Sequence, residues 1–315
     1  MKPPQHLVTG GAGFIGSNLV RKLVEAGSSV RVVDDLSTGK RDNLAGLSNV
    51  ELVQGDLSEM PLDAVVDGID VIFHLAAVPS VPRSVADPLR SHAASATATL
   101  RLLEAARAAK VRRFITSSSS SVYGDAADLP VSEAAPTSPR SPYAVGKLAA
   151  EGYTRVFASL FGMSTVSLRY FNVFGTHQDP SSQYAAVVPR FITAHLRGER
   201  PRVFGDGRQS RDFTFVDNVV EANLLAAQAP HLAGESINVA SGVPYSLLDV
   251  LAELQDILGT RLEPVFEPDR PGDIKHSHAN IGRARELLGY EPRVDFREGL
   301  RRTTEWLKGA PSPSR

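Results

Sequence analysis

The chain has 315 residues, of which 42% are hydrophobic and 22% are charged, and its formal net charge is −1. This size and composition predict a globular protein with a large core, arranged as one big domain or two. The balanced charge, without a long run of Lys and Arg, argues against nucleic acid as a partner. We expect no membrane association and a cytoplasmic location, because the first predicted strand begins near residue 6 and no 18-residue apolar run follows.

The chain contains no cysteine, which excludes disulfide bonds, a catalytic thiolate and a zinc site with cysteine ligands. His276 and His278 flank Ser277 at strand spacing, without a cluster of carboxylates nearby in the sequence. This pattern is more typical of polar surface than of a metal site, so no metal is expected.

A glycine-rich segment, residues 10–16, follows a short apolar run at residues 7–9 and leads into a helical pattern at residues 17–24. This order predicts a strand, a tight turn and a helix. Glycines in such a turn bring bare backbone against a diphosphate, and the N-terminus of the helix then faces the anion. The segment is a candidate dinucleotide-binding turn, with an ordinary strand-to-helix turn as the alternative.

The next predicted strand, residues 30–33, ends in Asp34, which lies 18 residues after Gly16. A carboxylate at this position can accept hydrogen bonds from both hydroxyls of the adenosine ribose. Asp35 follows directly, and its charge would repel the 2′-phosphate of NADP. The pattern therefore predicts NAD as the cofactor.

The first half of the chain continues to alternate strands and helices. Strands are predicted at residues 50–53, 71–75, 114–116 and 164–168, with helical stretches between them. Such alternation indicates an α/β fold, a Rossmann-type doubly wound parallel sheet.

After about residue 169 the pattern loosens into shorter pieces interrupted by Pro and Gly, which predicts a smaller α/β substrate-binding domain. Residues 212–216 and 236–239 still resemble strands of the main sheet. We therefore predict two interleaved domains and a short tail. The NAD-binding domain comprises residues 1–169 and about 211–240, the second domain comprises about 170–210 and 241–308, and residues 309–315 form a disordered tail.

A predicted helix that begins near Ser141 places Tyr143 and Lys147 four residues apart on one face. A free tyrosine has a pKa of about 10, so it needs a nearby cation to act as a base near neutral pH. Lys147 and the positive charge of a nicotinamide ring could supply it. The serines at residues 117–121 follow a predicted strand, at the sheet edge where ligands bind. Taken alone, either pattern is also common on plain surfaces and loops.

Together these segments resemble the extended short-chain dehydrogenase/reductase superfamily, and specifically the UDP-hexose 4-epimerases, closest to those that act on UDP-N-acetylglucosamine. The resemblance covers nearly the whole chain. It also includes residues 169–172, 210–213 and 270–273.

The resemblance implies four catalytic residues. Ser119 and Ser121 would contact the sugar near its 4-hydroxyl, Tyr143 would be the general base, and Lys147 would bind the nicotinamide ribose and acidify Tyr143. It also implies that the following residues contact NAD: Gly10, Gly13, Phe14, Ile15, Gly16, Asp34, Asp35, Ser37, Thr38, Gly39, Asp56, Leu57, Leu75, Ala76, Ala77, Tyr143, Lys147 and Tyr170.

On the substrate side the resemblance implies a UDP-sugar site. Arg211 and Arg270 would converge on the diphosphate, and Asp273 would bind the uridine ribose. The full set of substrate contacts would be Ser80, Ser119, Ser121, Tyr143, Asn172, Gln178, Ala186, Val187, Val203, Phe204, Arg211, Arg270, Asp273 and Ser277. The implied reaction oxidises C4 to a 4-keto sugar and returns the hydride to the opposite face, with NAD retained between turnovers.

Several residues bear on the identity of the sugar. Ser120 and Ser121 stand where dehydratases and decarboxylases of the family carry an acid, and residues 176–186 lack the Arg of uronate epimerases. Ser277 occupies the position that resembles the gate on the sugar 2-substituent, where a small residue leaves room for an N-acetyl group. The expected substrates are UDP-N-acetylglucosamine and UDP-N-acetylgalactosamine, with UDP-glucose and UDP-galactose also accepted.

Residues 93–98 depart from the family, because this Ala-rich segment stands where many epimerases are rich in Asn, so contacts assigned there in relatives cannot be carried over. The alternatives are a UDP-glucuronate 4-epimerase, another nucleotide-sugar oxidoreductase, and a non-catalytic dinucleotide-binding regulator. The resemblance further implies a homodimer that pairs through the helices around residues 95–109 and 143–161.

Overall fold

The computed structural model describes residues 5–126, 128–180, 186–269 and 274–309. A seven-stranded sheet in the order β11-β6-β5-β4-β1-β2-β3 forms its centre, and all neighbouring strands are parallel. The strands are β1 (His6–Thr9), β2 (Val30–Asp34), β3 (Val50–Gln54), β4 (Val71–His74), β5 (Arg113–Ser119), β6 (Thr165–Tyr170) and β11 (Ala233–Val239). The predicted Rossmann-type sheet is confirmed, including residues 236–239 within β11.

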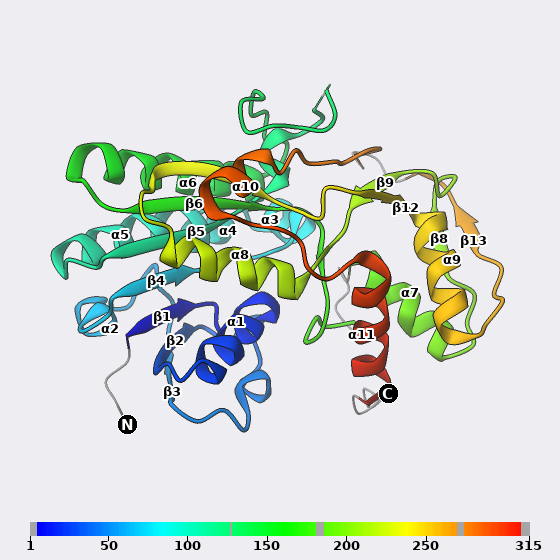
Figure 1. The fold of residues 1–315 in the computed structure, drawn as a ribbon, viewed down its shortest axis with the longest axis horizontal. Helices are drawn as coiled ribbons and strands as arrows, with labels where there is room; N and C mark the ends of the chain where they lie inside the picture. The colour runs from blue at the N-terminus through cyan, green and yellow to red at the C-terminus, as the bar shows by residue number, and fades with distance from the viewer. Residues whose placement is uncertain (1–4, 127, 181–185, 270–273, 310–315) are drawn as a thin grey trace.

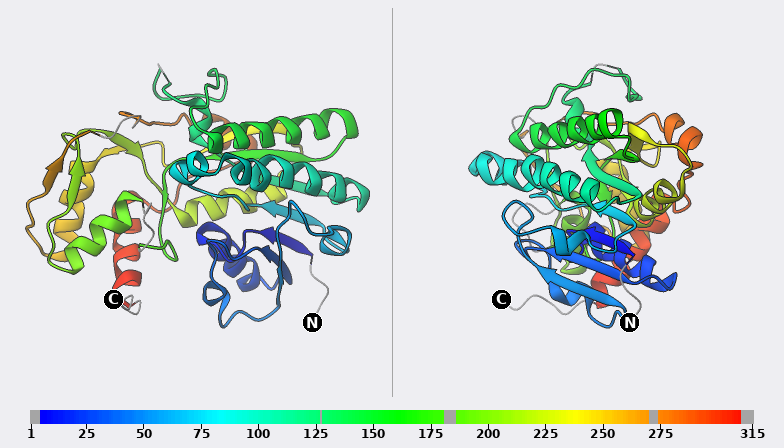
Figure 2. Two further views of the ribbon diagram at one scale, coloured as in Figure 1. Left: turned by 180° about the vertical axis from the view of Figure 1, so that it is seen from behind. Right: turned by 90° about the vertical axis from the view of Figure 1, so that its left-hand side faces the viewer.

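Two layers of helices cover the sheet (Figure 1 and Figure 2). Helices α1 (Phe14–Glu25) and α8 (Val216–Gln228) pack on one face. The other face carries α5 (Ala98–Ala108) and the long α6 (Pro142–Phe161). Shorter elements are η1 (Arg41–Leu44), α2 (Asp63–Val66), α3 (Val81–Ala86), α4 (Pro88–His92), the π-helical turn η2 (Ala93–Thr97), η3 (Ser120–Tyr123) and α10 (Gly282–Leu288).

The core explains why the strands read as continuous apolar runs. Successive side chains of a strand point to opposite faces, and here both faces are buried. Val8 and Phe73 belong to the cluster beneath α1 and α8, whereas Leu7 and Ile72, one position earlier, belong to the cluster beneath α5. Both faces therefore require apolar residues.

Elements from the second half gather at one end of the molecule, as Figure 1 shows. They comprise α7 (Val187–Leu196), β8 (Arg202–Phe204), β12 (Pro244–Ser246), α9 (Leu247–Leu258), β13 (Val265–Glu267) and α11 (Phe296–Gly309). The strand pairs here are β13 with β8 and β12 with β9 (Ser210–Asp212). The exact domain boundaries stay a prediction, and of the predicted tail all but Gly309 lies outside the described residues.

The assignment of residues 212–216 to the main sheet was wrong. β10 (Thr214–Phe215) instead pairs with β7 (Val173–Phe174) in a separate two-stranded sheet, and β9 pairs with β12. The reason is that β5 and β11 already occupy both sides of β6, so the segment has no partner there. Only the helix that follows, α8, packs on the main sheet.

Among the described helices, none combines the length and apolar character needed to cross a membrane.

Candidate active site

The glycine turn between β1 and α1 is closely packed. Gly10 has a φ of +68°, and a Cβ atom added there would lie 2.8 Å from the Ala76 nitrogen. A Cβ atom added at Gly16 would lie 2.1 Å from the Gly10 carbonyl oxygen. The N-cap of α1 is Gly13, and no side chain caps this helix. The turn therefore presents bare backbone and a helix N-terminus, which suits the diphosphate of a dinucleotide.

Asp34 ends β2 beside this turn and is only 7% exposed. Its carboxylate accepts hydrogen bonds from the backbone nitrogens of Ala12 and Leu36, each at 2.9 Å. Burial raises the pKa of Asp34, and these two hydrogen bonds oppose that shift. A Cβ atom at Gly39 would lie 2.8 Å from the Asp34 carboxylate, so glycine keeps space open there. These features fit a dinucleotide with its ribose near Asp34.

The other predicted cofactor residues lie in the loops that follow neighbouring strands. Asp35 accepts from the Ser37 nitrogen and hydroxyl, and Asp56 accepts from Ser58 in the same way. The Leu75 nitrogen donates to the Thr9 carbonyl at 3.1 Å. These loops follow β2, β3 and β4, so together with the glycine turn after β1 they share the carboxyl edge of the sheet, where ligands bind in this type of fold.

Tyr170 has a different environment from the other predicted cofactor residues. It is 7% exposed, and its hydroxyl lies 3.0 Å from the Asn223 side-chain oxygen on α8. Burial raises the pKa of this phenol. These contacts explain Tyr170 as a buried link between β6 and α8, and its role as a cofactor contact stays a prediction.

Tyr143 and Lys147 lie in the first turns of α6, whose N-cap Ser141 accepts from the Ala144 nitrogen at 3.2 Å. The Tyr143 side chain hydrogen-bonds Ser119 at the end of β5. Lys147 Nζ donates to the carbonyl and to the hydroxyl of Ser117, at 2.8 and 3.0 Å. The fold thus joins the tyrosine–lysine pair to the serine segment, although the two are separate in sequence.

The charges at this site differ from the expectation. Burial raises the pKa of Tyr143, and the hydrogen bond from Ser119 lowers it only in part. Lys147 directs its ammonium group to Ser117, and burial lowers the pKa of Lys147 to about 8 while Glu151 raises it. The phenol is therefore held protonated, and further positive charge is needed to activate it.

Ser121, the other predicted catalytic serine, lies in η3. Its backbone nitrogen donates to the Ser119 hydroxyl at 3.2 Å. Its own hydroxyl is buried and has no hydrogen-bond partner among the described residues. An unpaired buried hydroxyl calls for an explanation, and a polar group of a substrate is one that fits.

Two predicted substrate residues from distant segments meet. The Asn172 side-chain nitrogen lies 3.4 Å from the Asp212 carbonyl and 3.5 Å from the Ser277 hydroxyl. Asn172 has a φ of +34°, an uncommon value that places its amide beside both. Arg211 donates to the carbonyls of Ser210 and Lys275, at 2.9 and 3.2 Å. Arg270 and Asp273 lie outside the described residues.

The remaining predicted substrate residues are spread over several elements. Val203 is buried in β8, and the Arg190 guanidinium lies 5.8 Å from the ring centre of Phe204. Gln178 donates to the Val173 carbonyl at 3.3 Å. Ser80 is the N-cap of α3, Ala186 is the exposed N-cap of α7, and Val187 begins α7. Their substrate contacts stay predictions.

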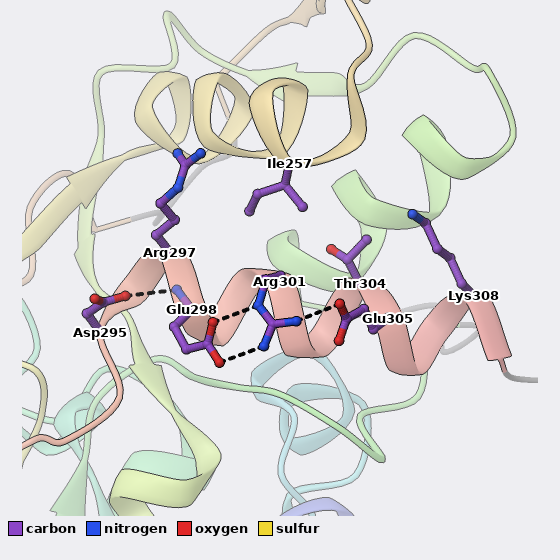
Figure 3. Close-up of a pocket in the computed structure, with 8 residues that line it drawn as sticks. All are labelled: Ile257, Asp295, Arg297, Glu298, Arg301, Thr304, Glu305 and Lys308. Atoms are coloured by element: carbon purple, nitrogen blue, oxygen red, sulfur yellow. Dashed lines mark hydrogen bonds and ion pairs between the residues drawn. The ribbon is translucent and has the colours of Figure 1, made fainter.

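A separate cavity of about 480 Å³ lies between α9 and α11 (Figure 3). The two arginines that line it form ion pairs with acidic side chains: Arg301 with Glu298 and Glu305, and Arg297 with Glu253. Its lining contains none of the predicted site residues. This cavity is therefore no candidate for the chemistry at Tyr143.

Sequence reasoning missed the charged residues beneath the site. Glu151 and Arg169 form a buried ion pair next to the serine segment, with a nitrogen–oxygen distance of 2.7 Å. The available signal was the spacing of Tyr143, Lys147 and Glu151, which places three polar residues at four-residue intervals on one helical face. His74 was missed as well: its two ring nitrogens lie 2.8 and 2.9 Å from the hydroxyls of Thr9 and Thr99.

Residues 6–240 match the model of the NAD dependent epimerase/dehydratase family. The chain is 41% identical over 308 residues to the UDP-glucose 4-epimerase of Mycolicibacterium smegmatis, covering 96% of this chain and 98% of that one.

Solved structures agree over almost the whole chain. The UDP-N-acetylglucosamine 4-epimerase of Methanobrevibacter ruminantium M1, in complex with UDP-N-acetylmuramic acid, superposes with a TM-score of 0.93 at 40% identity, covering 98% and 99% of the two chains. The UDP-glucuronic acid 4-epimerase of Bacillus cereus, in complex with UDP-glucuronic acid and NAD, gives 0.88 at 34% identity, covering 96% and 98%. These relatives differ in their sugars.

Proposed function

This chain belongs to the NAD dependent epimerase/dehydratase family and is an NAD-dependent isomerase of UDP-sugars, and on that premise we propose that it inverts C4 of UDP-N-acetylglucosamine and UDP-N-acetylgalactosamine. UDP-glucose and UDP-galactose are proposed as further substrates. The observation that carries the reaction is the joining of Tyr143 to Ser119 and of Lys147 to Ser117 at the carboxyl edge of the sheet.

Each residue has a distinct role in the proposed reaction. The Tyr143 oxygen takes the proton of the sugar 4-hydroxyl and later returns it. The Ser119 hydroxyl hydrogen-bonds Tyr143 and is proposed to hydrogen-bond the sugar 4-hydroxyl as well, so that it shares the proton between them. Lys147, which is held by Ser117, supplies positive charge within the same site, and a bound nicotinamide ring would supply the further positive charge that the phenol needs. Asp34, the glycine turn and the N-terminus of α1 hold the dinucleotide. NAD, when bound, supplies the acceptor and donor of the C4 hydride.

The choice of an N-acetylated sugar is supported by Ser277. This small, half-buried residue faces Asn172, the proposed diphosphate contact. The proposed sugar site next to the diphosphate is therefore bordered here by a short side chain. A serine permits a bulky 2-substituent without requiring one, because unfilled space costs only modest contact energy.

The test is proton NMR of the purified protein mixed separately with UDP-N-acetylglucosamine, UDP-glucose and UDP-glucuronate, without added cofactor. Appearance of the N-acetylgalactosamine signal supports the proposal and the retention of NAD. Conversion of the glucuronate alone would replace it with a uronate epimerase. No conversion in any tube, even after addition of NAD, would favour the non-catalytic regulator.

Replacement of Ser277 by tyrosine is expected to lower kcat/KM for UDP-N-acetylglucosamine by about 10- to 100-fold, because the larger ring fills the space proposed for the acetamide. Turnover of UDP-glucose should change by less than about threefold. The measurement is the ratio of the two kcat/KM values. An unchanged ratio would remove Ser277 from the specificity of the enzyme.

We also propose a homodimer, formed through a row of exposed apolar side chains. Val145, Val156 and Leu160 on α6 are 50%, 43% and 70% exposed, and Leu89 on the adjoining α4 is 84% exposed. Contiguous exposed apolar surface is typical of an interface. Val81 and Val85 on α3 are also exposed, so we propose α3 and α4 beside α6, while the part of the predicted interface at residues 95–109 stays a prediction.

Substitution of Val156 by lysine is expected to convert the dimer to a monomer, because it places a charge within the apolar row. Sedimentation velocity measures the change. Phe266→Lys is the matched control, since Phe266 is 55% exposed on β13, away from the row. A wild-type monomer, or a dimer in both variants, would disprove this interface.

A further inference from the structure

A buried network lies one helical turn beyond Lys147 along α6. The Glu151 side chain is 1% exposed, and its carboxylate accepts from the Arg169 guanidinium at 2.9 and 2.7 Å. It also accepts from the hydroxyls of Ser118 and, at 3.0 Å, Ser236. The carboxylate therefore ties α6 to three adjacent strands of the sheet, β5, β6 and the edge strand β11.

The same network continues toward the serine segment. Arg169 donates to the Tyr123 hydroxyl at 2.8 Å, and Tyr123 donates to the Asn238 side-chain oxygen at 2.7 Å. Tyr123 ends η3, which also contains Ser121. The network thus touches the segment that carries both predicted catalytic serines.

Stability does not explain such a network well. Removing two charges from water is unfavourable, and apolar residues of similar volume often stabilise a core equally well or better. A role in the chemistry of the neighbouring residues is a better explanation, because Ser118 lies between Ser117, the partner of Lys147, and Ser119, the partner of Tyr143.

We propose that Glu151 is a positioning residue for the epimerisation: through Ser118, Arg169 and Ser236 it fixes the serine segment of β5 against α6, and it sets the electrostatic environment of Lys147 one helical turn away. This inference rests on the proposed function, in which the Lys147 charge supports proton transfer at Tyr143.

The electrostatics agree with the geometry. Burial lowers the pKa of Lys147 to about 8, and the negative charge of Glu151 opposes this shift. His74, on β4, also interacts with Lys147, but burial lowers the pKa of His74 to about 3, so its ring is neutral. Helices α3 and α4 also pack against α6. Their ionisable side chains, Arg83, Arg90 and His92, are exposed to solvent.

Two substitutions at the ion pair should shift the titration of Lys147 in opposite directions. In Glu151→Gln the negative charge is lost and the Arg169 cation remains, so Lys147 should lose its proton about one pH unit lower. In Arg169→Met the carboxylate is left with Lys147 as its cation, so Lys147 should lose its proton at a higher pH. A purely structural role predicts lower activity in both variants and no opposite shift.

The experiment measures two quantities on the NAD-loaded protein between pH 6 and pH 10. The first is the alkaline limb of kcat, followed by proton NMR of the UDP-sugar. The second is the titration of lysine ε-carbons in protein labelled with ¹³C at that position, which is practical because the chain has seven lysines. Lys147→Met identifies the resonance of Lys147.

Ser236→Ala is the matched control, because it removes one hydrogen bond to Glu151 and no charge. Both quantities should stay within about 0.3 pH units of wild type in this variant. If Glu151→Gln does not fold, the double variant Glu151→Gln/Arg169→Met removes the pair without leaving one charge unpaired. The alkaline limb of its kcat should lie at a lower pH than that of wild type.

Opposite shifts in both readouts support the proposal. Shifts in the same direction in the two variants overturn it. A Lys147 titration that is the same in Glu151→Gln as in wild type overturns it as well. A wild-type protein that converts no UDP-sugar would disprove the proposed function, while the lysine titration would still report on the coupling of Glu151 and Lys147.

Discussion

Replacement of Tyr143 by phenylalanine is expected to reduce kcat for the UDP-sugar by about 10²- to 10⁴-fold, the range that a positioned general base contributes. The substitution removes only the phenol oxygen, which contacts Ser119 at the end of β5. The aromatic ring, the α6 backbone and the proposed diphosphate contacts remain. Affinity for the UDP-sugar should therefore change by less than about threefold.

The measurement combines single-turnover kinetics with calorimetric binding of the UDP-sugar. Tyr153→Phe is the control, because Tyr153 lies on the same helix, is 37% exposed, and should tolerate the same change without loss of rate. Full activity of Tyr143→Phe would show that another group takes the proton. Equal losses in both variants would indicate damage to α6 instead.

The second large effect is expected for Gly16→Ala, which should abolish retention of NAD during purification and lower the melting temperature by several degrees. The added Cβ atom would lie 2.1 Å from the Gly10 carbonyl oxygen and 2.7 Å from the Gly11 Cα atom. Both neighbours are backbone, so the turn itself must move, and overpacking of this kind costs about 1–3 kcal/mol. The displaced turn is the one proposed to hold the diphosphate.

Retained cofactor is measured by the absorbance of the supernatant after denaturation, and stability by thermal unfolding. Gly152→Ala is the matched control: it lies within α6, and a Cβ atom there would meet nothing within 4 Å. It should keep NAD and leave the melting temperature unchanged or raised, since alanine favours a helix over glycine by about 1 kcal/mol. Normal NAD content in Gly16→Ala would contradict the proposed turn.

Where a local pattern was enough, sequence reasoning located the elements correctly. The apolar runs predicted the strands of the sheet, since residues buried on both faces must be apolar along their whole length. The prediction for residues 212–216 was wrong because apolar side chains in this segment are buried equally well when it pairs with β7 in a small separate sheet. Periodicity reports burial and says nothing of which strand is the neighbour.

Features that depend on neighbours along the chain could be predicted from the residues alone: the glycine turn, the acid that ends β2, and the four-residue spacing of Tyr143 and Lys147 on one helix. How these residues are paired and charged depends on the packing of distant segments. Lys147 meets Ser117 across 30 positions, and Glu151 meets Arg169 across 18. Such contacts arise when α6 packs on the sheet, and the burial that follows moves the pKa values of Tyr143 and Lys147 away from those of the free side chains.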